Sequence, residues 1–440
     1  MSDVVELVQQ LIRNRCVNEG TPESGGEAAN ADLLAGYLEG AGLDMQRFDS
    51  APGRSNLVAR IEGSDPTAPT LCLLGHTDVV PVNEDRWERD PFGGELIDGY
   101  VWGRGAIDMF NLTASMAVAT KALASSGFRP RGTLIYAAVA DEEALGTYGA
   151  KFLLDHEVDS VRCDYLITEA GGMPMSTPAG IRLPVLTGEK GPMWSRLRVV
   201  GTPGHGSMPY GANNALVKAA EVVRRLDQYR PAARIDSAWQ AFVGGLGLPD
   251  DLVAALTSPE GVDAALPLMT PGLARLAHAC THTTITPTVM RTGTKVNVIP
   301  DTVDIELDIR AMTGVGTDEI RDMLVDALGD MIDEVEIHPG HSDMATASPA
   351  GTPLWEAMGR AGAQFYDSAQ LLAMPMAGTT DARHFRRSLD TVAYGFGLFS
   401  QRMTLEELAP MAHGDNERID VDSLEMATSL WDVLVRDFLG

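Results

Sequence analysis

The sequence has few cysteines for its length and little positive charge. No CxxC pair is present among the four widely separated cysteines, Cys16, Cys72, Cys163 and Cys280. This spacing excludes a disulfide framework and a thiolate metal cluster, and it predicts buried thiols in a cytoplasmic protein. Lys and Arg number 34 against 61 Asp and Glu, for a net charge of -27. Such a field repels phosphate backbones and anionic lipids, so neither nucleic acid nor a membrane surface is expected as a partner.

Long hydrophobic runs are also missing. Residues 1–16 mix acidic residues and two arginines into a helical apolar pattern, so we predict neither a signal peptide nor a membrane span. Hydrophobic residues make up 45% of the chain and charged residues 22%, which is typical of a globular protein and excludes disorder and a fibrous repeat. At 440 residues the chain is expected to form two or three domains.

Helical and buried-strand patterns alternate over the first 190 residues. Helices are predicted at 4–12, 33–38 and 112–125, and strands at 56–61, 70–74, 132–140 and 165–168. The last two strands are continuously apolar, which is typical of strands buried on both faces. We therefore predict an α/β catalytic domain with a mixed sheet covered by helices.

The pattern changes at about residue 192, where strands begin to alternate as if one face were open. Helices are predicted at 213–229, 317–331 and 352–363, and strands at 195–200, 296–310, 335–338 and 391–396. We expect an inserted α+β domain with an open-faced sheet at 192–346, within a catalytic domain formed by 1–191 and 347–440. Short helical pieces at 231–283 are interpreted as an elaboration of the insert.

One candidate for chemistry lies where the strand at 70–74 ends, a position at which α/β sheets build sites. His76 and Asp78 are two residues apart on the same side of the chain. The imidazole could bind a metal while Asp78 accepts a hydrogen bond from its other nitrogen. The alternative is a loop histidine capped by a carboxylate.

Further carboxylates follow other predicted strands and turns. Asp108 precedes a helix and either caps it or bridges two cations. Three acids at 141–143 repel one another unless cations neutralise them, or else they form a solvated loop. Glu169 ends the strand at 165–168, and His413 lies near the C-terminus. Two histidines, three carboxylates and one spare glutamate are the ligand count for two zinc ions and a base.

The order and wording of these motifs resemble a known family. His76-Thr-Asp78, Gly103-Arg-Gly-Ala-Ile-Asp108, Glu142-Glu143, Glu169 and His413 are similar to the motifs of the dizinc exopeptidases and amidohydrolases. That family includes succinyl-diaminopimelate desuccinylase, acetylornithine deacetylase, aminoacylase and glutamate carboxypeptidase. The resemblance extends over nearly the whole chain and implies a zinc-exopeptidase-like fold that binds two Zn2+, for which Co2+ or Mn2+ could substitute.

Carried over position by position, the resemblance implies a role for each motif residue. One carboxylate bridges the two metals and each metal has two further ligands, which gives the set Asp108, with His76 and Glu169 on one side and Glu143 and His413 on the other. Glu142 is implied as the general base, and Asp78 as the residue that orients the histidine ligand.

The family also carries a lid domain through which subunits pair, which implies a homodimer. Residues 201–211 resemble the lid motif whose histidine reaches an active site, usually that of the partner subunit, and this role falls on His205. Asn297 and Arg310 match positions that hold the substrate carboxylate, and a further substrate loop contains Gly378 and Thr379. For Arg310 the alternative is a surface cation paired with a nearby acid.

Departures from the family pattern bear on the substrate. Many relatives carry a lysine and a small residue where this chain has Phe110 and Asn111, which predicts an apolar wall beside the metals, to which Trp194 or Trp239 could contribute. The elaboration of the insert is also longer than in the compact desuccinylases, and both features weaken the case for a diaminopimelate substrate. Glu169, in place of the aspartate of the family's aminopeptidases and dipeptidases, favours substrates with a free carboxylate.

We therefore predict a dizinc-dependent hydrolase that cleaves the amide bond of N-acyl amino acids or of C-terminal residues, as an aminoacylase, deacylase or carboxypeptidase does. Its expected substrates are small N-acyl amino acids or peptides. A dipeptidase or aminopeptidase is the alternative among enzymes. A catalytically silent dimeric binding protein is the alternative of another class, and the intact Glu142 argues against it.

Overall fold

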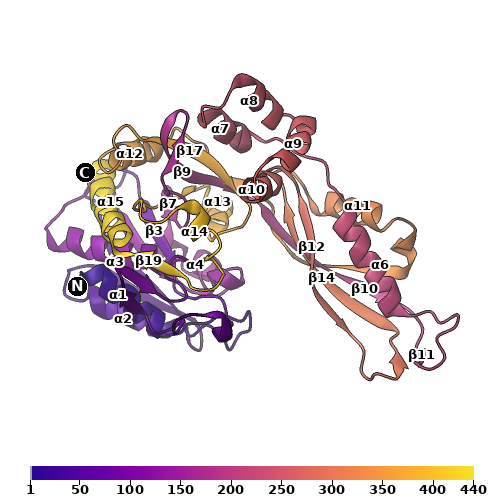
Figure 1. Ribbon diagram of the computed structural model, residues 1–440. Coiled ribbons are helices and arrows are strands. Elements are labelled where there is room, and N and C mark those ends of the chain that lie inside the picture. The colour runs from indigo at the N-terminus through magenta and orange to yellow at the C-terminus, as the bar shows by residue number, and fades with distance from the viewer. Residues whose placement is uncertain (1) are drawn as a thin grey trace.

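A computed structural model describes residues 2–440, which form a large and a small sheet joined near one end (Figure 1). Within these residues the large sheet has the strand order β1-β2-β6-β3-β7-β18-β9-β16, and β17 and β8 also pair with β9. Its strands are β1 (Asp44–Ala51), β2 (Arg54–Ile61), β3 (Leu71–His76), β6 (Leu134–Val139), β7 (Tyr165–Thr168), β8 (Met175–Thr177), β9 (Gly180–Glu189), β16 (Thr346–Ala347), β17 (Gln370–Met376) and β18 (Val392–Gly395). Parallel and antiparallel pairs both occur, so the predicted mixed sheet is confirmed.

Helices cover both faces of the large sheet (Figure 1). Side chains of β3 alternate between two separate apolar cores, because Leu71 and Leu73 pack on one face and Cys72 and Leu74 on the other. The first core includes α1 (Asp3–Arg13), α2 (Ala28–Leu38), α3 (Phe110–Ser125), α12 (Pro353–Gly362) and α15 (Val421–Leu439), and the second includes α4 (Ala150–His156), α5 (Val158–Val161) and α13 (Ala382–Leu389). Every residue of β6 is buried, as its continuous apolar run predicts, and in β7 only Tyr165 is partly exposed. Every residue of β3 is buried as well.

The small sheet has the order β12-β14-β10-β15 and is antiparallel throughout. Its strands are β10 (Gly191–Val200), β12 (Thr284–Thr292), β14 (Thr302–Ala311) and β15 (Val335–Ser342). Alternate residues of β14 are buried, because α6 (Ala215–Gln228) and α11 (Thr317–Leu328) cover one face and leave the other open. The open-faced sheet is therefore confirmed. α11 ends at Leu328, three residues before the predicted 331, and is followed by Gly329, whose positive φ of 56° suits glycine.

The chain crosses between the two sheets at two places. β9 ends in the large sheet at Glu189, and β10 begins in the small sheet at Gly191. Between them Lys190 is buried, and its Nζ donates hydrogen bonds to the carbonyl oxygen of His282 (2.7 Å) and to Thr284 Oγ1 (3.3 Å). The return crossing lies between β15 and β16. Both crossings are close to the domain boundaries that we propose at 192 and 346.

A run of short helices, here called the strap (residues 237–281), packs differently from the prediction. It comprises α7 (Ser237–Gly245), α8 (Asp250–Leu256), α9 (Pro259–Ala265), η3 (Leu266–Leu268) and α10 (Pro271–Thr281). Its apolar core contains Leu372 of β17, and the guanidinium of Arg182 in β9 donates to the carbonyl oxygen of Gly245 at 2.9 Å. The strap therefore rests on the edge of the large sheet and is not an elaboration of the insert alone. Figure 1 shows it between the two sheets.

Smaller elements complete the chain. A three-stranded sheet joins β4 (Glu95–Ile97), β5 (Tyr100–Trp102) and β19 (Arg418–Asp420), and a two-stranded sheet joins β11 (Gly204–His205) to β13 (Val298–Ile299). The remaining elements are η1 (Glu84–Arg86), η2 (Glu142–Ala144), η4 (Gly329–Glu334) and α14 (Leu405–Leu408). All four cysteines are free and buried, as predicted. Among residues 2–440, none of the helices combines the length and the apolar character that crossing a lipid bilayer requires.

Candidate metal centre

The carboxyl ends of the parallel strands bring the motif residues to one edge of the large sheet. His76 is the last residue of β3, Glu169 follows the neighbouring β7, and Glu143 lies just after β6. Asp108 lies in the turn before α3, and His413 in the loop before β19. Pairing of β19 with β5 brings this C-terminal loop next to the turn that carries Asp108.

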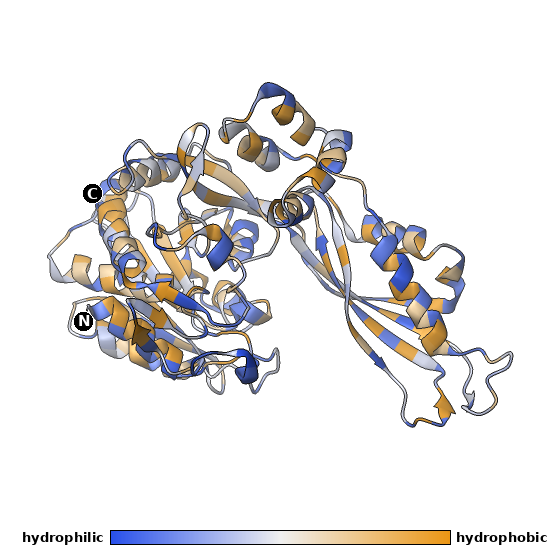
Figure 2. Cartoon of the chain, viewed as in Figure 1, coloured by the Kyte–Doolittle hydropathy of each residue, from blue (hydrophilic) through white to orange (hydrophobic). Residues whose placement is uncertain are grey.

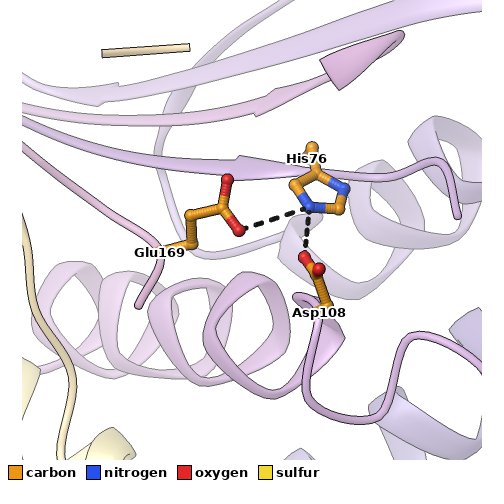
Figure 3. Close-up of side chains that lie close together, drawn as sticks. All are labelled: His76, Asp108 and Glu169. Atoms are coloured by element: carbon orange, nitrogen blue, oxygen red, sulfur yellow. Dashed lines mark hydrogen bonds and ion pairs between the residues drawn. The ribbon is translucent and has the colours of Figure 1, made fainter. Parts of the chain in front are cut away.

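Two groups of metal-ligating atoms share one carboxylate. His76 Nε2 lies 3.0 Å from Asp108 Oδ1 and 3.8 Å from Glu169 Oε2, and both carboxylates are directed at the imidazole (Figure 3). On the other side, His413 Nε2 lies 3.2 Å from Asp108 Oδ2 and 3.0 Å from Glu143 Oε2. The ligand atoms within each group all lie within 4.8 Å of one another. Asp108 therefore offers one oxygen to each group, as a ligand bridging two ions would.

The centre gathers an excess of negative charge, which helps to raise the pKa values of three of its groups. Burial and the charge of Asp108 raise the pKa of Glu169 to about 8. Hydrogen bonds to Asp108 and Glu143 raise the pKa of His413 to about 10. Burial, reinforced by Glu169, raises the pKa of Glu142 well above its usual range. Glu143 Oε1 is buried and has no hydrogen-bond partner among the described residues. Imidazole and carboxylate donors in this arrangement fit two divalent cations such as zinc.

Asp78 supports the centre in two ways. His76 Nδ1 lies 3.0 Å from the main-chain oxygen of Asp78 and 3.6 Å from its carboxylate, so the carbonyl is the nearer partner of the ring. A neutral imidazole that donates there keeps Nε2 free for a metal. The Asp78 carboxylate accepts hydrogen bonds from the backbone N–H groups of Glu142 (3.2 Å) and Glu143 (3.1 Å) and from Asn18 Nδ2 (2.9 Å). Asp78 therefore fixes the loop that carries the candidate base.

A buried ion-pair network beneath that loop is absent from the sequence-based prediction. Arg54 Nε lies 2.8 Å from Glu27 Oε2, and Arg54 Nη2 lies 2.6 Å from Asp141 Oδ1. Asp141 and Leu145, which flank the loop, have left-handed backbones with φ of 69° and 79°. Non-glycine residues seldom adopt this conformation, and it persists where surrounding contacts enforce it, often at functional sites. No local motif marks Arg54, because its partners are far away in sequence.

Glu417 is a second residue that the sequence-based prediction does not assign. It is fully buried, and its Oε2 accepts hydrogen bonds from Arg104 Nη1 (2.7 Å) and the N–H of Gly105 (3.1 Å). Its Oε1 accepts from the N–H groups of Ile107 (2.7 Å) and Asp108 (3.1 Å). One carboxylate therefore holds the turn that presents the shared ligand. Its place four residues after His413 is the only signal in the sequence.

The predicted substrate residues are divided between two places. Arg310 Nη1 donates to Thr379 Oγ1 at 2.9 Å, across the junction of the two sheets, and Arg310 Nε donates to Asp308 Oδ1 at 2.8 Å. Gly378 precedes Thr379 in the loop after β17. Arg310, Thr379 and their loop therefore lie together, and the guanidinium has a second partner in the acid that the surface-cation alternative expects.

The loop after β17 also contacts the loop of the candidate base. The N–H and hydroxyl of Thr380 donate to the buried carboxylate of Glu189, at 2.7 and 2.9 Å. Arg383 Nη2 donates to the carbonyl oxygen of Leu145 at 2.9 Å. Arg383, in α13, also donates through Nη1 to the carbonyl oxygen of Thr380 at 2.6 Å. A chain of contacts therefore runs from Arg310 through the loop after β17 to the loop of the candidate base.

His205 and Asn297 lie together at the far end of the small sheet, remote from the metal centre of their own chain (Figure 1). The N–H of Gly206 donates to the carbonyl oxygen of Asn297 at 2.8 Å. His205 Nδ1 accepts a hydrogen bond from the N–H of Ser207 at 3.2 Å. In a neutral imidazole the proton therefore resides on Nε2, which is exposed and free to donate.

The apolar wall predicted beside the metals is not formed as expected. Phe110 is buried in the core, where its ring packs under the turn at Gly105. Trp239 is buried in the strap, and its Nε1 donates to a carbonyl oxygen there. Both predictions are wrong, because each of these aromatic rings is packed in an apolar core. Trp194 alone of the three is exposed.

Paired ligand groups that share a carboxylate, next to a partly buried glutamate, are the arrangement of a metal-dependent hydrolase. A profile of peptidase family M20/M25/M40 matches residues 72–437. The chain therefore belongs to this family, and the predicted resemblance and fold class are confirmed.

Three individual proteins that resemble the chain have sequence identities between 18% and 34%. The N-fatty-acyl-amino acid synthase/hydrolase PM20D1 of Xenopus tropicalis is 27% identical over 88% of this chain and 75% of its own length. A succinyl-diaminopimelate desuccinylase of Cereibacter sphaeroides is 34% identical, but the match spans 52% of this chain and 57% of that enzyme. The crystal structure of the M20 family metallo-carboxypeptidase Sso-CP2 from Sulfolobus solfataricus covers 100% of this chain and 99% of its own, with a TM-score of 0.76 and 18% identity. That last likeness concerns the fold.

Proposed function

We propose that the protein is a dizinc hydrolase that releases an amino acid with a free carboxylate from an N-acyl amino acid or a peptide. The observation that carries the proposal is the position of Asp108, with one oxygen in each ligand group. The first group would hold one ion through His76 and Glu169, and the second would hold another through Glu143 and His413. When bound, such ions lower the pKa of water and polarise a carbonyl group.

The chain's own residues supply the proton transfers and the orientation. Glu142 is partly buried beside the ligands, so it can take a proton from the attacking water and return it to the leaving amine. Asp78 holds the backbone of Glu142 in place. Arg310, oriented by Asp308 and Thr379, would bind the substrate carboxylate in a charge-assisted pair.

Chelation tests the metal requirement. Removal of metal should abolish hydrolysis, and zinc, cobalt or manganese should restore it. Glu142→Ala removes the base without removing a ligand, so metal content should stay at two ions per chain while turnover falls by roughly 10² or more. Full activity of metal-free protein would refute the proposal. Loss of metal from Glu142→Ala would mean that Glu142, not Glu143, is the ligand.

We also propose that the protein works as a homodimer in which His205 and Asn297 serve the partner's active site. Several large apolar side chains at the same end of the small sheet are exposed: Met208, Tyr210, Leu216, Val217, Val296 and Val298. Figure 2 shows hydrophobic segments in this part of the chain. Clustered exposed apolar side chains mark interaction sites. His205 Nε2–H would then donate to the oxyanion that forms at the scissile carbonyl.

The four free thiols suit the cytoplasm, where we place the protein.

A complementation experiment tests the shared site. Two inactive variants, His205→Ala and Glu142→Ala, are mixed under conditions that exchange subunits. Each mixed dimer would hold one site with both residues intact, so about a quarter of wild-type activity should return after random exchange. No recovery from a demonstrated mixed dimer would place His205 outside the partner's site.

A second candidate function, a dipeptidase or aminopeptidase of the same family, has a different requirement. The proposed carboxylate pair with Arg310 predicts that replacing the substrate carboxylate by a carboxamide lowers kcat/KM by at least about tenfold, because a hydrogen bond to a charged group contributes about 1.5–3 kcal/mol. Equal turnover of the acid and the amide would favour an aminopeptidase. The comparison is made on zinc-loaded protein with alanylleucine and its C-terminal amide, both of which carry the free amino group that an aminopeptidase requires.

A further inference from the structure

We infer that Trp194 and the groove beside it form a subsite for a large apolar side chain on the residue that carries the substrate's free carboxylate. The groove lies on the open face of the small sheet and has a volume of about 600 Å³. Its lining combines Trp194, Pro339 and His341 with the charged side chains of Arg196, Glu306 and Asp308. The inference rests on the proposed function and names the class of amino acid that the enzyme would release.

Trp194 is fixed in place while its ring stays accessible. Its Nε1 donates to Asp308 Oδ1 at 3.0 Å, so the polar edge of the indole is satisfied. The residue nevertheless remains 37% exposed. A ring whose N–H is paired and whose face is open offers apolar area to a ligand at little conformational cost.

One carboxylate oxygen connects Trp194 to the candidate carboxylate-binding residue. Asp308 Oδ1 accepts hydrogen bonds from both Trp194 Nε1 and Arg310 Nε, at 3.0 and 2.8 Å. In a substrate the side chain and the carboxylate are bonded to the same α-carbon. The scissile acyl group must reach from that α-carbon to the metal ligands, so with the carboxylate bound at Arg310 the side chain is the substituent left to fill the groove beside Trp194.

Strand β15 forms the wall of the groove opposite Trp194 and lies close to this residue. β15 has an irregular register opposite this residue, which pairs Met193 with Ser342 but Ser195 with Pro339. A Cβ at Gly340 would lie 2.9 Å from the carbonyl oxygen of Trp194, so only glycine lets the strands approach this closely. The extra residue places the His341 ring 6.1 Å from the indole.

The wall is also tied to the metal centre. His341 Nε2 lies 3.1 Å from Asp343 Oδ2, which lies 3.2 Å from Arg383 Nε. Arg383 in turn binds the carbonyl oxygen of Leu145, at the end of the loop that carries Glu142. The groove thus has a fixed position relative to the candidate base.

The test compares substrates that differ only in the side chain: N-acetylalanine, N-acetylleucine, N-acetylphenylalanine and N-acetylglutamate. Wild-type protein should prefer the phenylalanine substrate to the alanine one. Trp194→Ala should lower this ratio of kcat/KM by about tenfold, whereas Trp194→Phe, which keeps an aromatic ring, should preserve most of it. Leu268→Ala removes a more exposed apolar side chain on the strap, outside the groove, and should leave the ratio unchanged.

A binding measurement separates the subsite from the proposed reaction. Zinc-loaded Glu142→Ala is titrated calorimetrically with N-acetylphenylalanine and N-acetylalanine, with and without Trp194→Ala. The affinity ratio should fall by about tenfold with the tryptophan removed. If wild-type protein hydrolyses none of the substrates, the proposed function fails while this ratio still decides the subsite. An unchanged ratio, equal losses for both ligands, or a preference for N-acetylglutamate would overturn the inference.

Discussion

Replacing Glu417 by glutamine should weaken both the fold and the metal centre. Each carboxylate oxygen of Glu417 accepts two hydrogen bonds, and the two donors to Oε1 are the N–H groups of Ile107 and of the shared ligand Asp108. Glutamine keeps one oxygen and turns an NH2 group toward two of the four donors. Two buried donors without acceptors, and an Arg104 without its anion, should together cost about 3–5 kcal/mol of unfolding free energy.

The metal effect follows from the turn that the carboxylate holds. Asp108 supplies an oxygen to both ligand groups, so a shift of its backbone disturbs both ions. Loss of a partner that orients metal ligands typically reduces affinity by about 10- to 100-fold. Urea unfolding of the metal-free protein measures the first effect, and a competitive zinc titration measures the second.

Asp415→Asn provides a matched control, since it makes the same acid-to-amide change two residues away. Asp415 accepts no side-chain hydrogen bond and forms no ion pair within the described residues, so its replacement should alter stability by less than about 0.5 kcal/mol. A Glu417→Gln protein as stable and as metal-avid as this control would refute the assignment of Glu417 as the residue that positions Asp108.

Two further predictions concern buried charges. Burial lowers the pKa of Lys190 from 10.5 to about 7. Above pH 7 Lys190 therefore binds a proton in the unfolded chain but not in the folded one, so this residue makes the free energy of unfolding rise with pH. In urea unfolding, Lys190→Met should lack about 2–3 kcal/mol of this increase between pH 7 and 9. The same pH dependence of the unfolding free energy in wild type and Lys190→Met would contradict this prediction. Arg54→Met leaves Glu27 and Asp141 without their cation and should cost about 3–5 kcal/mol. Arg131→Met, which removes an exposed ion pair, should lower the free energy of unfolding by less than about 1 kcal/mol. If Arg54→Met costs no more than this control, the buried network does not stabilise the protein.

The strands and their ends are what the sequence makes predictable. β3, β6 and β7 are runs of consecutive apolar residues, and because such runs need cover on both faces, their burial follows from composition. Each motif residue adjoins one of these strands or a glycine-flanked turn. Parallel strands end at the same edge, so local motifs separated by dozens of residues point to one site.

Contacts between distant segments could not be predicted in this way. Arg54 meets Asp141, and Glu417 meets the turn at Asp108, through pairings that depend on the completed sheets. The same applies to Phe110 and Trp239, whose aromatic side chains suit a cleft or a core equally well. Which of the two each ring enters depends on the nearest apolar surface, and no local pattern specifies that surface.

The strap has a mechanical consequence. The two chain crossings on their own would let the small sheet rotate about the axis that joins them. The strap is a third attachment, because its apolar core includes Leu372 of β17 while Asp236 beside it accepts a hydrogen bond from Thr313 Oγ1, four residues before α11, at 3.3 Å. This third attachment restricts rotation of the small sheet unless α7 slides over the large sheet. The distance between Arg310 and the metal ligands, and with it the length of substrate that spans them, is thereby set partly by a segment that touches neither.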